Sequence, residues 1–208
     1  MTFPDMAHLF VIIWLGWAIS WTVSAVWTGR NYRRLRSCDA LGARLLIVFG
    51  ALMLTNWAAR IAGAERLWQT DRPTALLLAV LTLTGILFAW WARIHLGLMW
   101  SGGIALKQGH RVVESGPYAL VRHPIYVGLL AATFATAIAQ GTPTAFAGWV
   151  LLACGASIKA RIEERFLAAE LASDAYASYR SRVPMMLPFA SFDTVYRARR
   201  LLRSAVCR

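Results

Sequence analysis

Two polar stretches of this chain hold the residue types that could form a chemical site. The first, residues 109–128, reads GHRVVESGPYALVRHPIYVG and runs into a long apolar block. Its Arg122-His123-Pro124 segment sets polar side chains at the start of a predicted helix, where proline is well placed. A helix N-terminus has unpaired N–H groups and a partial positive charge, so it suits a carboxylate or another anion. The simpler interpretation is that Arg122 and His123 anchor a helix at a membrane surface and that Tyr126 belongs to an aromatic belt.

The second polar stretch, residues 159–189, reads KARIEERFLAAELASDAYASYRSRVPMMLPF and contains two adjacent carboxylates. On a helix, Glu163 and Glu164 point about 100° apart, whereas Arg161 and Glu164 share one face. One glutamate can therefore face a site while the other faces solvent. A carboxylate in this place could bind an ammonium group or a ribose hydroxyl. The simpler alternative is a solvated cluster of charges.

The elements that position these stretches are apolar blocks long enough to cross a membrane. The chain is 58% hydrophobic and 15% charged, whereas soluble domains average about 45–50% apolar and about 25% charged residues. A helical span needs about 20 mostly apolar residues. The sequence therefore predicts an all-α fold, a polytopic membrane helical bundle that forms a single domain over residues 1–208. We expect about five spans, at Ala7–Trp27, Leu41–Ala59, Pro73–Leu96, Pro124–Ala139 and Thr144–Ile158.

The basic residues predict how the spans are oriented. The net charge is +12, and most Lys and Arg residues flank the apolar blocks, which favours the lipid bilayer over nucleic acid as a partner. Because loops rich in Lys and Arg stay inside, we expect an integral protein of a bacterial inner membrane with both polar stretches and the C-terminus in the cytoplasm. From Lys159 the pattern indicates a helix that leaves the membrane, and it is compatible with continuation from the fifth span. Residues 190–208 form a basic tail.

Other polar residues receive simple interpretations. Arg44 and Arg93 lie near span ends, where their side chains can reach the interface without any functional role. The three cysteines, Cys38, Cys154 and Cys207, are far apart and form no Cys-x-x-Cys or Cys/His cluster. The sequence therefore predicts neither a metal site nor a disulfide framework. The first apolar block has no basic segment before it and no cleavage signal after it, so we expect a retained span.

Taken together, the two polar stretches resemble one family. Ser-Gly-Pro-Tyr at 115–118 is followed by Arg-His-Pro-x-Tyr-x-Gly at 122–128 and, after a predicted helical hairpin, by Arg-x-Glu-Glu at 161–164. Tyr-x-x-Tyr-x-x-x-Val-Pro at 176–184 and Leu-Pro-Phe at 187–189 complete the order. This set resembles the membrane methyltransferases typified by isoprenylcysteine carboxyl methyltransferase and phospholipid N-methyltransferase. The resemblance covers a core of residues 93–189, and the spans in residues 1–92 carry no matching motif.

The resemblance implies that the chain is an enzyme that uses S-adenosylmethionine and binds it between the Arg-His-Pro-x-Tyr-x-Gly segment and the helix with the Glu-Glu pair. His123, Pro124 and Tyr126 would shape the cofactor pocket. The polar groups of the cofactor would be contacted by His110, Tyr118, Glu163 and Glu164. Arg161 would orient the substrate or cofactor, so we expect Arg161 and Glu164 to be the catalytic residues.

A lipophilic substrate would explain why such an enzyme spans a membrane. Its head group would meet the soluble cofactor at the cytoplasmic interface, held about 3–3.5 Å from the methyl group. A carboxylate needs no general base, whereas an amine or thiol needs a proton acceptor, and Glu163, Glu164 or His123 could serve. The alternatives are a membrane reductase that uses NADPH on a sterol-like substrate, and a membrane protein without enzymatic activity.

Overall fold

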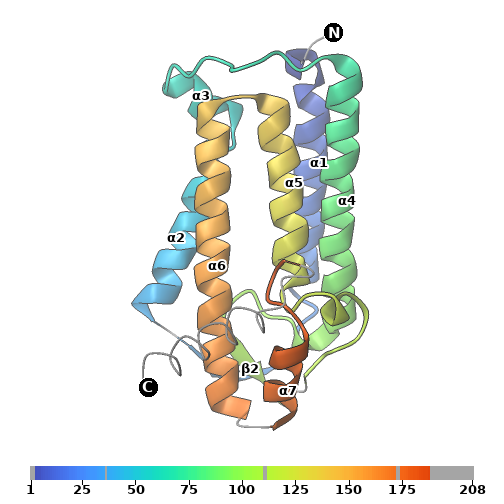
Figure 1. Cartoon of the computed structure of the whole chain (residues 1–208), viewed down its shortest axis with the longest axis vertical. Coiled ribbons are helices and arrows are strands. Elements are labelled where there is room, and N and C mark those ends of the chain that lie inside the picture. The colour runs from blue at the N-terminus through green and yellow to red at the C-terminus, as the bar shows by residue number, and fades with distance from the viewer. Residues whose placement is uncertain (1–2, 36, 110–111, 172–173, 188–208) are drawn as a thin grey trace, which may run out of the picture.

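A computed structural model of the chain describes residues 3–35, 37–109, 112–171 and 174–187. Long helices lie side by side, and short elements lie at both ends of the bundle (Figure 1). The α-helices are α1 (Phe3–Ser24), α2 (Cys38–Met53), α3 (Asn56–Ile61), α4 (Arg72–Leu96), α5 (Pro124–Gln140), α6 (Pro143–Leu171) and α7 (Asp174–Arg182). The remaining elements are the strands β1 (Asn31–Arg34) and β2 (Ala105–Lys107) and the 3₁₀ turns η1 (Gly97–Met99) and η2 (Gly116–Ala119). The predicted all-α membrane fold is confirmed.

Three helical segments in the described part of the chain are long and apolar enough to cross a membrane. They are Met6–Ser24, Arg72–Met99 and Pro143–Leu171. Helix α5 is apolar but has 17 residues, and α2 has 16. The predicted continuous span Leu41–Ala59 is wrong, because α2 ends at Met53 and α3 begins anew after Thr55. The Thr55 side chain accepts a hydrogen bond from the backbone N–H of Ala58 and so starts a separate helix.

Two helix pairs, α4 with α5 and α2 with α6, form the tightest contacts in the bundle. Glycines allow each pair to approach closely. A Cβ placed on Gly85 of α4 would lie 2.6 Å from the carbonyl oxygen of Gly128 on α5. A Cβ on Gly50 of α2 would lie 2.6 Å from that of Gly148 on α6. Small residues at such positions are typical of helices that pack inside membranes, where backbones gain contact by close approach.

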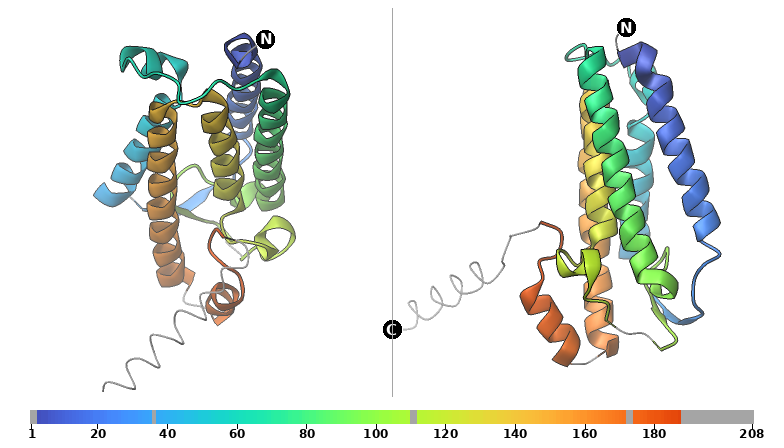
Figure 2. Two further views of the ribbon diagram at one scale, coloured as in Figure 1. Left: turned by 45° about the horizontal axis from the view of Figure 1, so that its top comes forward. Right: turned by 90° about the vertical axis from the view of Figure 1, so that its right-hand side faces the viewer.

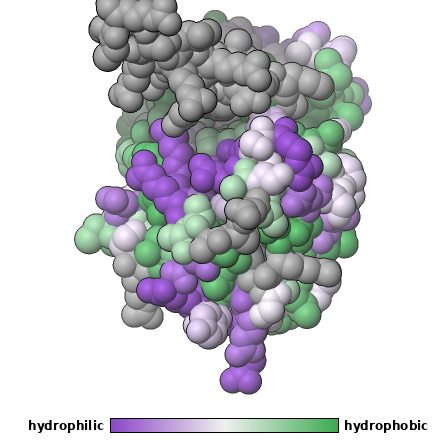
Figure 3. All heavy atoms as spheres, turned by 60° about the horizontal axis from the view of Figure 1, so that its bottom comes forward, coloured by the Kyte–Doolittle hydropathy of each residue, from purple (hydrophilic) through white to green (hydrophobic). Residues whose placement is uncertain are grey.

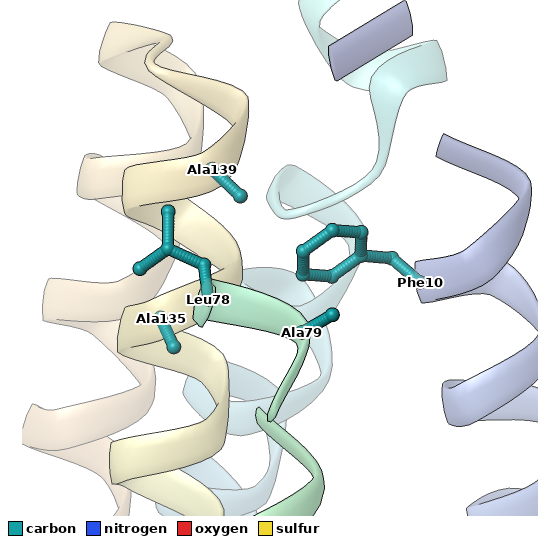
Figure 4. Close-up of a cluster of buried hydrophobic side chains, with 5 residues drawn as sticks. All are labelled: Phe10, Leu78, Ala79, Ala135 and Ala139. Carbon is teal, nitrogen blue, oxygen red and sulfur yellow. The ribbon is translucent and has the colours of Figure 1, made fainter. Parts of the chain in front are cut away.

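Helix α1 packs on α4 and α5 through a small apolar cluster. Phe10 points from α1 towards Leu78 and Ala79 of α4 and Ala135 and Ala139 of α5 (Figure 4). Several other apolar side chains of α1, including Val11, Ile12 and Ile19, remain exposed. In a membrane protein such side chains face lipid.

The C-terminal end of α1 is fixed by Arg93, whose side chain is fully buried. Its guanidinium donates hydrogen bonds to the carbonyl oxygens of Ser24 and Trp27 at 2.8 and 2.6 Å and of Gly97 at 3.0 Å. It also lies 4.4 Å from the ring centroid of Trp100. The interpretation of Arg93 as a side chain that reaches the membrane surface is therefore wrong. Its charge is stabilised by helix-terminal carbonyls and an aromatic face.

Both polar stretches lie at the same end of the bundle, as the sequence predicted (Figure 2). Strands β1 and β2 pair antiparallel there, with Arg34 opposite Ala105. Helix α6 is continuous from Pro143 to Leu171, so it carries Glu163 and Glu164 on the same helix as the fifth span. The chain then reverses into α7, which packs beside the start of α5.

Candidate functional site

Arg122, two residues before the start of α5, forms a bidentate ion pair with Glu164 on α6 at one end of the site. Its Nε lies 2.6 Å from Oε1 of Glu164, and one Nη lies 3.1 Å from Oε2. The two side chains are only 11% and 7% exposed, so the pair is largely shielded from water. The other Nη of Arg122 donates to the carbonyl oxygens of Arg180 and Val183. One guanidinium therefore connects α5, α6 and α7, in the planar geometry that arginine favours.

Backbone hydrogen bonds attach the segment after α7 to the start of α5. The N–H groups of Arg122 and His123 donate to the carbonyl oxygens of Pro184 and Met185 at 2.9 and 3.1 Å. The hydroxyl of Tyr179 donates to the carbonyl oxygen of Tyr118 at 2.8 Å. These bonds give the Tyr-x-x-Tyr and Val-Pro motifs a structural role, because they cover the start of α5 with α7.

Glu163 lies on the other side of the same helical turn and faces a different set of groups. Its carboxylate accepts a hydrogen bond from the hydroxyl of Tyr126 at 3.1 Å. The ring of Tyr126 stacks on that of His123, with centroids 5.3 Å apart and planes 7° from parallel. Lys159, one turn earlier on α6, places its Nζ 5.4 Å from the Tyr126 ring centroid. Nε2 of His123 lies 3.4 Å from Oε1 of Glu164, so the His123 ring lies between Glu164 and the ring of Tyr126 on which it stacks.

A cavity of about 330 Å³ lies between these groups and continues into the bundle. Ligand pockets have volumes of about 300–1,000 Å³, so this cavity could hold a small molecule. Its polar end is lined by Tyr118, His123, Tyr126, Lys159 and Glu163. Hydrophilic residues also gather on the surface at this end of the molecule, interspersed with hydrophobic ones (Figure 3).

The other end of the cavity is apolar and lies among the membrane helices. Its lining includes Trp17 and Trp21 of α1, Thr133 of α5 and Leu152 of α6. From Pro124 to Thr133 the α5 wall rises nine residues, or about 14 Å at 1.5 Å per residue. The length of this wall equals roughly half of a bilayer's hydrocarbon thickness of about 30 Å.

Three buried tyrosines at the polar end stay neutral. Burial raises the pKa of Tyr118, with a smaller contribution from the nearby negative charge of Glu163. Burial also raises the pKa values of Tyr176 and Tyr179. Their hydroxyl groups therefore remain hydrogen-bond donors at neutral and moderately alkaline pH.

The structure brings most of the predicted site residues together. Tyr118, His123, Pro124, Tyr126 and Glu163 line the cavity. Glu164 does not line it, because its carboxylate is taken up by Arg122. The sequence suggested that one of the two glutamates faces solvent, but Glu163 is half-buried and Glu164 is buried.

Two predicted residues stand apart from this group. Arg161 is exposed and does not line the cavity, because its position on α6 turns it away from α5. His110 lies outside the described residues. In the place where Arg161 was expected, the structure has Lys159, which lines the cavity. Lys159 is four residues from Glu163 and therefore lies on the same helical face. This spacing in the sequence could have identified Lys159 as a site residue.

The fold and the cavity define a class: helical membrane proteins with a cavity that joins a polar end to an apolar, membrane-embedded end. A model of the isoprenylcysteine carboxyl methyltransferase family matches residues 77–169, from within α4 almost to the end of α6. The chain is also 36% identical over 160 residues to the cobalt-zinc-cadmium resistance protein CzcN of Cupriavidus metallidurans, over 74% of this chain and 68% of that protein. The chain belongs to the isoprenylcysteine carboxyl methyltransferase family, which implies a membrane methyltransferase.

Proposed function

We propose that this protein transfers a methyl group from S-adenosylmethionine to a lipophilic substrate at the cytoplasmic face of a bacterial inner membrane. The observation that carries this proposal is the two-ended cavity. Its polar end offers carboxylate, imidazole and phenol groups, and its other end offers aromatic and aliphatic side chains at membrane depth. A soluble cofactor and a membrane-embedded substrate need these two environments next to each other.

The polar end suits the chemistry of the cofactor. S-adenosylmethionine supplies an electrophilic methyl group on a positively charged sulfur. The Glu163 carboxylate offers negative charge and accepts hydrogen bonds of the kind that a ribose hydroxyl or an ammonium group donates. The stacked rings of His123 and Tyr126 provide a flat wall, and aromatic faces attract cations. These residues therefore fit the group, and we assign cofactor binding to Tyr118, His123, Tyr126 and Glu163.

Arg122 and Glu164 act differently in this proposal. The guanidinium of Arg122 donates its hydrogen bonds within the described structure to the Glu164 carboxylate and to two carbonyl groups. The pair therefore holds α5, α6 and α7 in place and positions the cavity wall. Glu164 becomes a positioning residue, whereas the sequence suggested a catalytic one.

Lys159 takes the role that the sequence gave to Arg161. Its ammonium group borders the cavity near Tyr126, between the polar end and the membrane helices. It can bind a negative group of the acceptor and orient it. A carboxylate acceptor would lose its charge on methylation and needs no base. An amine or thiol acceptor would pass its proton to Glu163, the carboxylate that lines the cavity.

A reductase that uses NADPH fits the cavity less well. A phosphate-bearing cofactor needs several free cations or backbone N–H groups. The described lining includes two cationic side chains, Arg122 and Lys159, and Arg122 is already bound to Glu164. The methyltransferase proposal needs fewer cations and agrees with the family.

Calorimetric binding of S-adenosylhomocysteine to the detergent-purified full chain tests the proposal. Wild-type protein should bind it, and Glu163→Gln should weaken binding by about tenfold, the loss of a charged hydrogen bond of roughly 1.4 kcal/mol. Glu170→Gln is the matched control, since Glu170 lies on the same helix and pairs with exposed Arg33 instead of lining the cavity. Absence of binding by folded wild-type protein, or equal losses in both variants, would refute the assignment.

A further inference from the structure

A second hollow lies beside the cavity, between α6 and the start of α2. This groove, about 520 Å³ in volume, is formed by the start of α2, the residue before β2 and α6. Its polar lining residues are Ser37, Arg44 and Lys159, and its other walls are largely apolar, with Leu41 and Ile104 among them. The groove is thus a basic, partly apolar recess at the polar end of the bundle.

The charge of the groove is positive. Its lining, all of it in the described part of the chain, contains two cations and no carboxylate. Asp39, in the first turn of α2, is exposed and does not line the groove. Lys159 is partly engaged, because its Nζ donates to the carbonyl oxygen of Gly102 at 3.3 Å.

Arg44 is the cation that is left for a ligand. Its side chain is exposed, and it forms no ion pair with any residue that the structure describes. Its guanidinium lies against the backbone of Gly103, where an added Cβ would come within 2.8 Å of Nη2. The glycine thus gives the guanidinium room to lie at the edge of the groove. A planar guanidinium in this position suits the oxygens of a phosphate.

The apolar walls of the groove favour a lipid head group over a soluble phosphate as the ligand. On α2, Leu41, Leu45 and Phe49 are 57%, 60% and 57% exposed and extend from the groove along the helix into the membrane region. Acyl chains would cover this face while a head group lies at Arg44. Basic residues at the end of a membrane helix attract anionic lipids. A soluble phosphate would leave the apolar face unused.

We propose that this groove binds the head group of an anionic phospholipid, with the phosphodiester at Arg44 and the acyl chains along α2. The groove shares Lys159 with the cavity but no other lining residue, and the proposal does not depend on methyl transfer. Because Lys159 borders both hollows, a lipid bound here would lie next to the place where the proposed acceptor is held.

Cys38 provides a reporter, because it lines the groove and is exposed. The chain has three cysteines, so Cys154→Ser and Cys207→Ser leave Cys38 as the single thiol. In the detergent-purified full chain, dihexanoyl phosphatidylglycerol should slow maleimide labelling of Cys38, and dihexanoyl phosphatidylcholine at equal concentration should not. Arg44→Gln should weaken the protection about fivefold, the contribution expected of one basic residue near an anionic head group.

The controls decide between the sources of the effect. Arg60→Gln, an exposed residue of α3 at the opposite end of the bundle, should leave protection unchanged, and Arg44→Lys should retain most of it. Equal protection by the two lipids, or full protection in Arg44→Gln, would overturn the proposal. Protection by inorganic phosphate as strong as that by the anionic lipid would also overturn it, in favour of a soluble anion.

Discussion

The ion pair between Arg122 and Glu164 allows a quantitative test of how the site is held. Glu164→Gln keeps the shape of the side chain and one oxygen but leaves the guanidinium without a counter-charge. Removing one partner of a buried pair costs about 3–5 kcal/mol. The exposed fractions of 11% and 7% place this pair in that class. For a chain of this length the cost corresponds to a loss of roughly 10 °C in melting temperature.

Glu170→Gln on the same helix supplies the contrast. Glu170 pairs with Arg33, whose side chain is 64% exposed. An exposed pair contributes about 0–1 kcal/mol. Thermal unfolding of both variants in one detergent should therefore separate a large shift for Glu164→Gln from almost none for Glu170→Gln. If the ion pair acts as a unit, Arg122→Gln combined with Glu164→Gln should lose less than the sum of the single variants.

Glu164→Gln should also weaken the attachment of α7. Arg122 binds the carbonyl oxygens of Arg180 and Val183, and its hold on them depends on its own position against Glu164. Limited trypsin digestion should cleave after Arg180 and Arg182 faster in Glu164→Gln than in wild type. Equal melting temperatures and equal digestion rates for wild type and Glu164→Gln would refute the role of this pair.

Four further outcomes follow from other parts of the structure. Gly85→Ala should destabilise the bundle by about 1–3 kcal/mol, because its Cβ would meet the carbonyl oxygen of Gly128; equal melting temperatures would contradict this packing. Arg93→Met should remove the guanidinium that donates to three carbonyl groups and so lower the melting temperature, and it should increase protease access to the loop after α1. Lys159→Met should raise the Michaelis constant of an anionic acceptor at least about tenfold, the loss of a charged hydrogen bond, with little change in S-adenosylhomocysteine affinity; an unchanged Michaelis constant would remove Lys159 from acceptor binding. Burial raises the pKa of Tyr118, so its hydroxyl should stay protonated at a pH of about 10, the ordinary pKa of tyrosine. From about pH 9 to about pH 10.5, the affinity for S-adenosylhomocysteine should therefore change equally in wild type and in Tyr118→Phe.

The parts of the fold that local signals specify could be predicted from the sequence. Proline marks the starts of α4, α5 and α6, and the apolar blocks that follow give the lengths of α4 and α5, whereas α6 continues past its apolar block into the second polar stretch. The division of the second apolar block was missed, because Thr55 lies in an apolar run and its hydroxyl makes a cap only when the chain bends there. A β-branched polar residue inside a predicted span was the available signal.

The parts that long-range contacts specify could not be predicted. Arg93 has the same sequence context as a side chain at a membrane surface, and only the packing of α1 on α4 brings the carbonyl groups of Ser24 and Trp27 to it. Arg122 is 42 residues from Glu164, so its partner depends on the hairpin of α5 and α6. The adjacent glutamates were found, but which of them lines the cavity follows from this partner.

The Glu-Glu pair connects the construction of the site with its chemistry. Two neighbouring residues on a helix point about 100° apart, so one turn of α6 can face two surroundings at once. Glu164 faces Arg122 and fixes the position of α6 against α5 and α7. That position in turn places Glu163 beside Tyr126, at the polar end of the cavity. A substitution of Glu164 therefore reaches the proposed cofactor site through geometry, whereas a substitution of Glu163 reaches it through charge. Melting temperature and ligand affinity should change together in the first case, and affinity alone should change in the second.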